Sequence, residues 1–147
     1  MKIVEMLDES LMNLDLKSND KASVIEEMID MLVKEGFVLS KEPLLKAIMD
    51  REATASTGVG MGIAIPHGKS GAVTKPSIVF GKSKKGIDFE ALDEQPSYII
   101  FLIAVPENSA NDHLKALSQL SRRLMNQEVR EQLMKAESTE EVFKVFI

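Results

Sequence analysis

Two histidines are the strongest candidates for chemistry in this chain of 147 residues, which contains no cysteine. His67 lies in the segment GIAIPHGKS at positions 62–70, and His113 follows the residues SAND at positions 109–112. A neutral imidazole is a competent nucleophile near neutral pH, and the phosphoramidate that it forms keeps a high transfer potential. The lack of cysteine excludes disulfides, thiolate metal sites and a cysteine nucleophile.

The neighbours of His67 favour an accessible side chain. Pro66 precedes it and Gly68 follows it, directly after the short apolar run at 63–65. Proline fixes the approach of the backbone, and glycine leaves one side of the imidazole uncrowded. We therefore expect His67 just past the end of a strand, with its ring presented at a surface.

Several other residues have the chemistry to hold an anion near an imidazole. His113 is expected in the first turn of a helix, where unpaired N–H groups and a partial positive charge favour an anion. Arg51 offers a planar guanidinium that matches phosphate oxygens. The small residues at 53–62 offer further donors. Those donors are the side chains of Thr54, Ser56 and Thr57 and the backbone of Gly58 and Gly60.

Each of these residues also has a simpler interpretation. His113 alone fits a residue at a helix start that bonds locally. Arg51 alone fits a solvated cation at a helix end, and residues 53–62 alone fit a flexible loop. Only their combination around one imidazole points to phosphate chemistry.

The residues GKS at 68–70 invite comparison with a nucleotide-binding P-loop. That motif needs a glycine five residues before its Gly-Lys pair, and it opens a helix. Ile63 occupies the glycine position, and Pro66 supplies no N–H to a phosphate. The glycines at 58, 60 and 62 precede a strand, whereas a dinucleotide fingerprint follows one. Neither nucleotide motif is present.

A metal site is another alternative, built from the two histidines with Asp112 or Glu52. The sequence has no short-range pair of ligands with the spacing that is usual in zinc sites. We therefore expect no metal and no other cofactor. A metal-dependent hydrolase stays open as an alternative, and it predicts stoichiometric zinc or manganese after purification.

Apolar residues at helical spacing predict the helices that position these residues. One helix has Asn19 or Asp20 as its N-cap and ends before Gly36. A second begins at Ser40 and ends at residues 51–52. A third begins near residues 109–111, with Leu114, Leu117, Leu120 and Leu124 facing inward. Two short helices follow, the last opened by the capping box of Ser138 and Glu141.

Strands are predicted at residues 63–65, 76–82 and 98–105, and a loop at 53–62. The stretch 98–105, YIIFLIAV, is typical of a strand that is covered on both faces. Helices flank the strands on both sides in the sequence, which predicts an α/β fold: a mixed β-sheet with helices on both faces. We expect one domain spanning residues 1–147.

Composition limits the partners. The formal net charge of -5 argues against a nucleic-acid surface. The longest apolar run is far shorter than the roughly 20 residues that a membrane span needs. Acidic residues at positions 5, 8 and 9 interrupt any signal-peptide core. We expect no nucleic-acid partner, no membrane insertion and a cytoplasmic location.

Taken together, these segments resemble the fructose/mannitol-type IIA component of the bacterial phosphoenolpyruvate:sugar phosphotransferase system. The matching segments are RE at 51–52, STGVG at 56–60, GIAIPHGK at 62–69, GIDF at 86–89, FLIA at 101–104 and HL at 113–114. Asp93, Pro96 and Pro106 match as well. One departure is Glu94, which stands where the family commonly has glycine.

The resemblance implies that His67 is phosphorylated, with His113 and Arg51 lining the same pocket. The donor would be the phosphocarrier protein HPr, the acceptor a IIB component, and sugar would enter through a membrane IIC component. The leucine-rich segment after His113 and the GIDF stretch look closest to the fructose branch. The PHGK tetrapeptide also occurs in the nitrogen-regulatory branch, so a phosphorylation-gated binding module is the alternative function.

Transfer of a phosphoryl group between two histidines is nearly thermoneutral, so such a protein mainly aligns the reactants and stabilises charge. No metal is required. The hypothesis does require that the imidazole be accessible and lie near Arg51 and the side chain at 113. Partners would dock on a shallow apolar patch around Val59, Met61 and the helix at 111–124.

Overall fold

The computed structural model describes residues 2–109 and 111–147, without the side chains of residues 112 and 113. In this described part, six strands form one mixed sheet in the order β1-β5-β6-β3-β2, and β4 also pairs with β6. The strands are β1 (Leu7–Asn13), β2 (Gly58–Gly60), β3 (Ile63–Ala64), β4 (His67–Ser70), β5 (Ser77–Ile87) and β6 (Ser97–Pro106). The helices are α1 (Ile3–Met6), α2 (Lys21–Lys34), α3 (Lys41–Thr54), α4 (Asp112–Leu124), α5 (Gln127–Lys135) and α6 (Thr139–Lys144).

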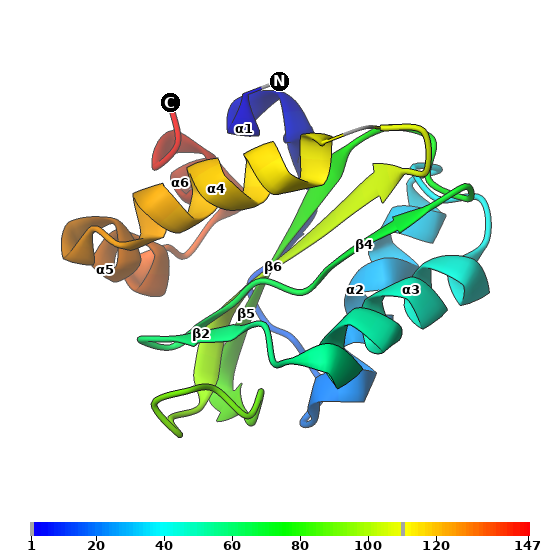
Figure 1. Ribbon diagram of the computed structural model, residues 1–147. Helices are drawn as coiled ribbons and strands as arrows, with labels where there is room; N and C mark the ends of the chain where they lie inside the picture. The colour runs from blue at the N-terminus through cyan, green and yellow to red at the C-terminus, as the bar shows by residue number, and fades with distance from the viewer. Residues whose placement is uncertain (1, 110) are drawn as a thin grey trace.

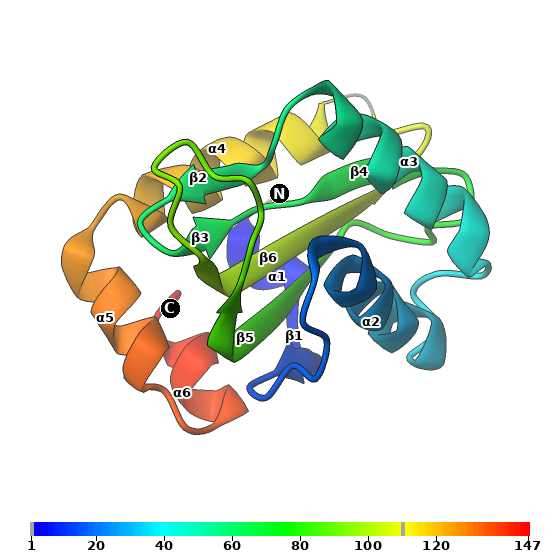
Figure 2. The ribbon, with the colours of Figure 1, turned by 90° about the horizontal axis from the view of Figure 1, so that it is seen from below.

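Helices cover both faces of the sheet, as the sequence predicted. Helices α2 and α3 pack on one face, and α1, α4, α5 and α6 pack on the other (Figures 1 and 2). Strand pairing is parallel for β1 with β5, and for β3 and β4 with β6, while β5 pairs with β6 in the antiparallel sense. The prediction of an α/β fold with a mixed sheet is confirmed.

Strand β6 is the central strand and connects the two hydrophobic cores. Phe101 and Ile103 point toward the layer of α4, α5 and α6, whereas Ile100 and Leu102 point toward α2 and α3. All four side chains are fully buried. Successive residues of a strand face opposite sides, so a strand with a helical layer on each side must be apolar throughout. This confirms the prediction that residues 98–105 form a strand covered on both faces.

The predicted helix starts are also present. Asp20, rather than Asn19, caps α2, because its carboxylate accepts the backbone N–H of Ser23 at 2.8 Å. The Ser138 hydroxyl accepts the backbone N–H of Glu141 at 3.1 Å at the start of α6. Helix α3 begins after Ser40 and continues to Thr54, slightly beyond its predicted end.

One inward position of α4 was predicted wrongly. Leu120 and Leu124 are buried as expected and Leu117 is partly buried, but Leu114 is 53% exposed. Leu114 precedes Leu120 by six residues, which turns it about 120° around the helix at 3.6 residues per turn. Ala116, one turn before Leu120, takes the inward position.

The sequence did not predict α1, β1, β2 or β4. Strand β1 pairs with β5 through Leu7 and Met12, with a register shift between them, so its residues do not alternate between buried and exposed. Strand β2 lies inside the predicted loop at 53–62 and exists through its antiparallel pairing with β3. Strand β1 depends on a partner distant in sequence, which local periodicity cannot report. Strand β2 has only three residues, too few to show an alternating pattern. Within residues 2–109 and 111–147, no helix has the length and apolar character needed to cross a membrane.

Candidate functional site

His67 is the first residue of β4, and it does not follow the end of a strand as predicted. Strands β3 and β4 lie one after the other along the same side of β6, separated by Ile65 and Pro66. The Ile103 N–H donates to the Pro66 carbonyl at 2.9 Å, and the Ile65 N–H donates to the Thr57 carbonyl at 3.0 Å. The two residues before His67 are therefore anchored from both sides.

A hydrogen bond at Nδ1 identifies the tautomer of the imidazole. Nδ1 of His67 lies 2.9 Å from the Ile65 carbonyl oxygen. A carbonyl oxygen only accepts, so Nδ1 must carry the hydrogen. In the neutral ring the lone pair then resides on Nε2, which makes Nε2 the nucleophilic nitrogen of His67.

The prediction of a surface-presented ring is wrong, because His67 is only 8% exposed. Strand β4 passes between α3 on one side and α4 on the other, and both helices contact it (Figure 1). The approach of α3 is very close at Gly68, where an added Cβ would lie 2.6 Å from Ile48 Cγ1. The imidazole is recessed between elements, with a small fraction of the residue still open to solvent.

Arg51 lies at the end of α3 that is nearer to His67. Figure 1 shows α3 and β4 side by side and running in opposite directions. Ile48 contacts Gly68, and Arg51 follows Ile48 by three residues on the same face of α3. Arg51 is half-buried, and its Nη1 donates to the Ala55 carbonyl at 2.9 Å, at the end of the helix.

His113 is the second residue of α4, the helix that contacts β4 from the side opposite α3. Its side chain and that of Asp112 lie outside the described residues. The predicted proximity of the His113 and His67 rings therefore stays a prediction.

The predicted phosphate donors Thr54, Ser56 and Gly58 all bond within the protein. The Thr54 hydroxyl donates to the Asp50 carbonyl at 3.4 Å, one turn back in α3. The Ser56 hydroxyl donates to the Phe89 carbonyl and accepts the Gly58 N–H at 2.9 Å. Donation from these hydroxyls to a phosphoryl group stays a prediction, and it requires these bonds to exchange.

Thr57 is held by Glu52, a residue that the sequence suggested only as a possible metal ligand and not as a support for the phosphate site. The Glu52 carboxylate accepts both the Thr57 hydroxyl and the Thr57 N–H, the latter at 3.2 Å, and it forms an ion pair with Lys21 at 2.7 Å. The buried positions of α3 are Leu44, Ile48 and Glu52. A carboxylate that continues an apolar row at intervals of four residues was the signal that could have identified it.

The geometry excludes a P-loop, whereas the metal alternative depends partly on the side chains of Asp112 and His113, which lie outside the described residues. The GKS residues at 68–70 are part of β4, and the next element is the strand β5, so no P-loop exists here. Among the residues that the structure describes, no group of three or more His, Asp or Glu side chains is arranged to hold a metal ion. Glu52, one carboxylate considered for such a site, is occupied by Lys21 and Thr57.

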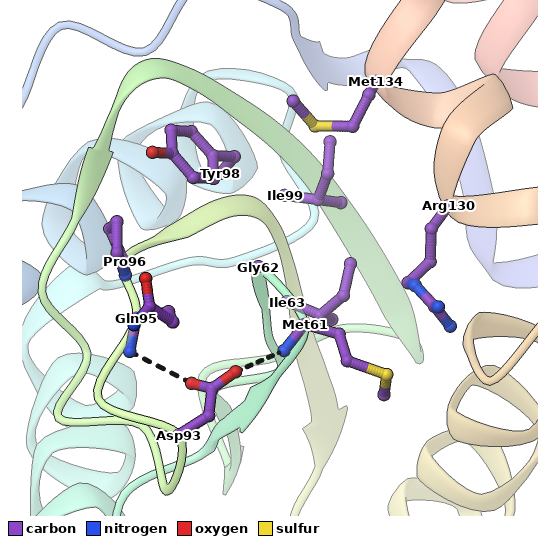
Figure 3. A pocket seen from close by; sticks show the side chains of 10 residues that line it. All are labelled: Met61, Gly62, Ile63, Asp93, Gln95, Pro96, Tyr98, Ile99, Arg130 and Met134. Atoms are coloured by element: carbon purple, nitrogen blue, oxygen red, sulfur yellow. Dashed lines mark hydrogen bonds between the residues drawn. The ribbon is translucent and has the colours of Figure 1, made fainter. Parts of the chain in front are cut away.

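A cavity of about 340 Å³ lies near the β2–β3 turn, and His67 is not among its lining residues. Figure 3 shows the Asp93 carboxylate beside it, accepting the backbone N–H groups of Met61 at 2.9 Å and Gln95 at 3.1 Å. Both bonds hold the pKa of Asp93 below its ordinary value, and the bond from Met61 has the larger effect. Glu94 has φ +60°, a conformation that favours glycine, which explains why the family commonly has glycine there.

The Asp93→Asn variant is expected to be less stable than wild type at pH 7, because a neutral amide oxygen is a weaker acceptor for the two N–H groups. The pKa of Asp93 is lower in the folded protein than in the unfolded chain, where it is near 3.9. The charged carboxylate therefore stabilises the fold above that pH, and this stability is lost as the pH falls through the pKa of the folded state. The difference in urea midpoint should therefore shrink below about pH 4. Glu94→Gln, which removes the neighbouring charge, is the control; an equal difference at every pH for Asp93→Asn would contradict the prediction.

The sequence matches a known protein family over nearly its whole length. The family model described as "Phosphoenolpyruvate-dependent sugar phosphotransferase system, EIIA 2" matches residues 5–147. The fructose-specific EIIABC component of Bacillus subtilis (strain 168) is 45% identical over 145 residues, which are 99% of this chain and 23% of that protein. The fructose-specific EIIA component of Haloferax volcanii is 45% identical over 132 residues, 90% of this chain and 86% of that protein.

Two solved structures share the fold over nearly the whole chain. The nitrogen regulatory protein IIA-Ntr of Neisseria meningitidis has a TM-score of 0.90 at 34% identity, covering 99% of each chain. The mannitol enzyme IIA of Escherichia coli, in its complex with phosphorylated enzyme IIB, has a TM-score of 0.80 at 27% identity, covering 93% of this chain and 94% of that one. The chain spans about a quarter of the length of the B. subtilis relative.

Proposed function

Because the chain belongs to the EIIA type 2 family of the phosphoenolpyruvate-dependent sugar phosphotransferase system, we propose that it is a phosphoryl carrier whose His67 is phosphorylated. The observation that supports this most directly is the bond from Nδ1 of His67 to the Ile65 carbonyl, which assigns the lone pair to Nε2. An imidazole fixed in one tautomer by a backbone group is prepared to act as a nucleophile.

In the proposed reaction, Nε2 of His67 attacks the phosphorus of the donor's phosphohistidine. A new N–P bond forms as the donor's N–P bond breaks, and the donor imidazole leaves with the electron pair. The His67 ring becomes cationic while Nδ1 keeps its hydrogen, and the Ile65 carbonyl stabilises that charge. In transfer to the acceptor, the acceptor's nucleophile bonds to phosphorus as the N–P bond breaks, and the electron pair returns to Nε2. These proposed steps involve no metal and no other cofactor.

Charge on the transferring oxygens needs positive groups around it. In this proposal Arg51 provides the guanidinium, and the first turn of α4, which includes His113, provides N–H groups. Thr54, Ser56, Thr57 and Gly58 complete the phosphate site once their internal bonds exchange.

The proposed partners are HPr as donor, a IIB component as acceptor and, indirectly, a membrane IIC component. The mannitol IIA structure in complex with phosphorylated IIB supports the IIB partner. Val59, Met61 and Leu114 are 46%, 55% and 53% exposed, which supports an apolar docking patch near the site. Because the imidazole is recessed, each partner must present its reacting group on a convex surface. One domain at 1–147 and a cytoplasmic location, where phosphoenolpyruvate is formed, belong to the same proposal.

Fructose is the proposed sugar, because the two relatives at 45% identity are named fructose-specific. The alternative is a nitrogen-regulatory protein that binds partners according to its phosphorylation state. The observation that supports this second candidate is the structural similarity to IIA-Ntr, with a TM-score of 0.90.

Labelling tests the proposal. With ³²P-phosphoenolpyruvate, enzyme I and HPr, the protein should acquire an acid-labile, alkali-stable label on the peptide that contains His67. Subsequent passage of the label to a fructose-type IIB protein would support sugar transport. Label that stays on the protein in the presence of fructose-type IIB would favour the regulatory alternative, and the lack of any label would refute the phosphoryl-carrier role.

Arg51 variants test the electrostatic part of the site. Arg51→Lys keeps the charge but loses the planar fork, and we expect phosphoryl transfer about tenfold slower. Arg51→Gln loses the charge too, and a reduction of about a hundredfold is expected. Single-turnover transfer from phospho-HPr measures both rates. Wild-type rates for both variants would remove Arg51 from the mechanism.

A further inference from the structure

A continuous path of polar contacts leads from Lys21 to the His67 imidazole. The Lys21 ammonium lies 2.7 Å from the Glu52 carboxylate, which accepts the Thr57 hydroxyl and, at 3.2 Å, the Thr57 N–H. The Thr57 carbonyl accepts the Ile65 N–H at 3.0 Å. The Ile65 carbonyl accepts the hydrogen on Nδ1 of His67 at 2.9 Å. Three of the four links to the ring thus depend on where Glu52 holds Thr57.

Burial makes this arrangement specific. The Glu52 side chain is 2% exposed and that of Lys21 is 15% exposed. A buried carboxylate is costly unless it is paired and hydrogen-bonded, so Glu52 needs both the ammonium and the two groups of Thr57. Conversely, two bonds to one carboxylate fix Thr57 in both position and orientation.

Lys21 adds a second connection to the same region. Its ammonium lies 5.7 Å from the centroid of the Phe89 ring and 3.7 Å from the Glu90 carboxylate. The Ser56 hydroxyl donates to the Phe89 carbonyl. Phe89 therefore contacts both Lys21 and Ser56, the neighbour of Thr57. Polar contacts therefore connect the start of α2 to the end of α3 and to residues 56–58.

We propose that Glu52 is a positioning residue for phosphoryl transfer. Through Thr57 and Ile65, Glu52 fixes the position of the Ile65 carbonyl, which orients the His67 ring. Glu52 also follows Arg51 directly, so its contacts hold the end of α3 in place. This inference rests on the proposed function of His67 and deepens it. Glu52 itself touches no reacting atom.

The chain offers a matched control for loss of an ion pair between α2 and α3. Lys41, the first residue of α3, lies 2.8 Å from Glu26 and 3.3 Å from Asp30 of α2. Lys41 precedes Glu52 by eleven residues, which is about 16 Å along the helix. Lys41→Met removes an ion pair between the same two helices, a more exposed one, at the opposite end of α3 from His67.

The test measures phosphoryl transfer from phospho-HPr to the purified full chain. Glu52→Gln is expected to lower the maximal transfer rate about 10- to 100-fold, because small misplacements of a reacting group cost that much. The half-saturating concentration of phospho-HPr should stay within about twofold of wild type, since Glu52 is buried. Lys41→Met should also stay within about twofold in rate.

A second pair of variants and a spectroscopic signal make the test independent of global stability. Thr57→Val removes the hydroxyl that Glu52 accepts, whereas Thr57→Ser keeps it. Because Thr57 is itself a proposed phosphate donor, these two variants are compared by the imidazole signal and not by rate. Nitrogen-15 NMR of the His67 imidazole should show the Nδ1–H tautomer as dominant in wild type, Lys41→Met and Thr57→Ser. Its population should fall in Glu52→Gln and Thr57→Val. Thermal unfolding confirms that each variant is folded.

Two results would overturn the proposal: a wild-type transfer rate in folded Glu52→Gln together with wild-type imidazole spectra in Glu52→Gln and Thr57→Val, or equal slowing by Lys41→Met. If Glu52→Gln does not fold, the Thr57 pair decides the question alone. A wild-type protein that takes no phosphoryl group on His67 would refute the proposed function. The tautomer signal would still report whether Glu52 orients the ring.

Discussion

Replacing His67 with glutamine is expected to lower phosphoryl acceptance from phospho-HPr more than about a thousandfold, because loss of a nucleophile leaves no covalent route. The glutamine amide can still donate to the Ile65 carbonyl, which accepts the ring hydrogen in the wild type, so the fold should persist. Label per mole of protein, separated from labelled HPr on a gel, measures the effect.

The chain has only two histidines, which makes the result easy to interpret. Acid-labile label that persists in His67→Gln would have to reside on His113, and the assignment of His67 would fail. Circular dichroism of the variant excludes loss of fold as the reason for a loss of label.

Gly68→Ala is expected to destabilise the protein by about 2–3 kcal/mol, typical of an overpacked core. The new Cβ would lie 2.6 Å from Ile48 Cγ1 and 3.2 Å from the Ile48 backbone nitrogen. Rotation of the Ile48 side chain cannot relieve the backbone contact, so α3 has to move away from β4. Thermal unfolding should show a midpoint about 5–10 °C lower. Transfer should slow as well, because Arg51 moves with α3.

Gly71→Ala is the matched control for this prediction. Its added Cβ would meet only Glu107 Oε2, at 3.1 Å, the end of a flexible side chain. We expect a change in the free energy of unfolding within about 0.5 kcal/mol. In an Ile48→Ala background, the cost of Gly68→Ala should shrink but not vanish, because the contact with Cγ1 is lost while the contact with the backbone nitrogen at position 48 remains. Equal stability of Gly68→Ala and Gly71→Ala would contradict the packing argument.

Features that depend on local pattern were predicted well from the sequence. The apolar run at 98–105 is the central strand, and Asp20 and Ser138 cap their helices. Each of these rests on side-chain periodicity or on a hydrogen bond within three residues. The left-handed conformation of Glu94 likewise agrees with the glycine that the family commonly has there.

Features that depend on contacts distant in sequence were not predicted. The burial of His67 results from α3 and α4 closing on β4, and β1 exists because β5 pairs with it. Glu52 was considered only as a possible metal ligand and as the neighbour of Arg51, because its role depends on Lys21, thirty-one positions earlier in the chain. The row Leu44, Ile48, Glu52 marks the carboxylate as buried, but the partner in another helix that pairs with it leaves no signal in α3.

The placement of β4 along the central strand β6 has a consequence for the order of events. His67 is attached to the most deeply buried strand, between two helices, so the ring cannot travel from one partner to another. In the proposed function, donor and acceptor must each come to the same recess, and one must leave before the other arrives. A carrier built this way operates by strict alternation, in which an excess of either partner excludes the other.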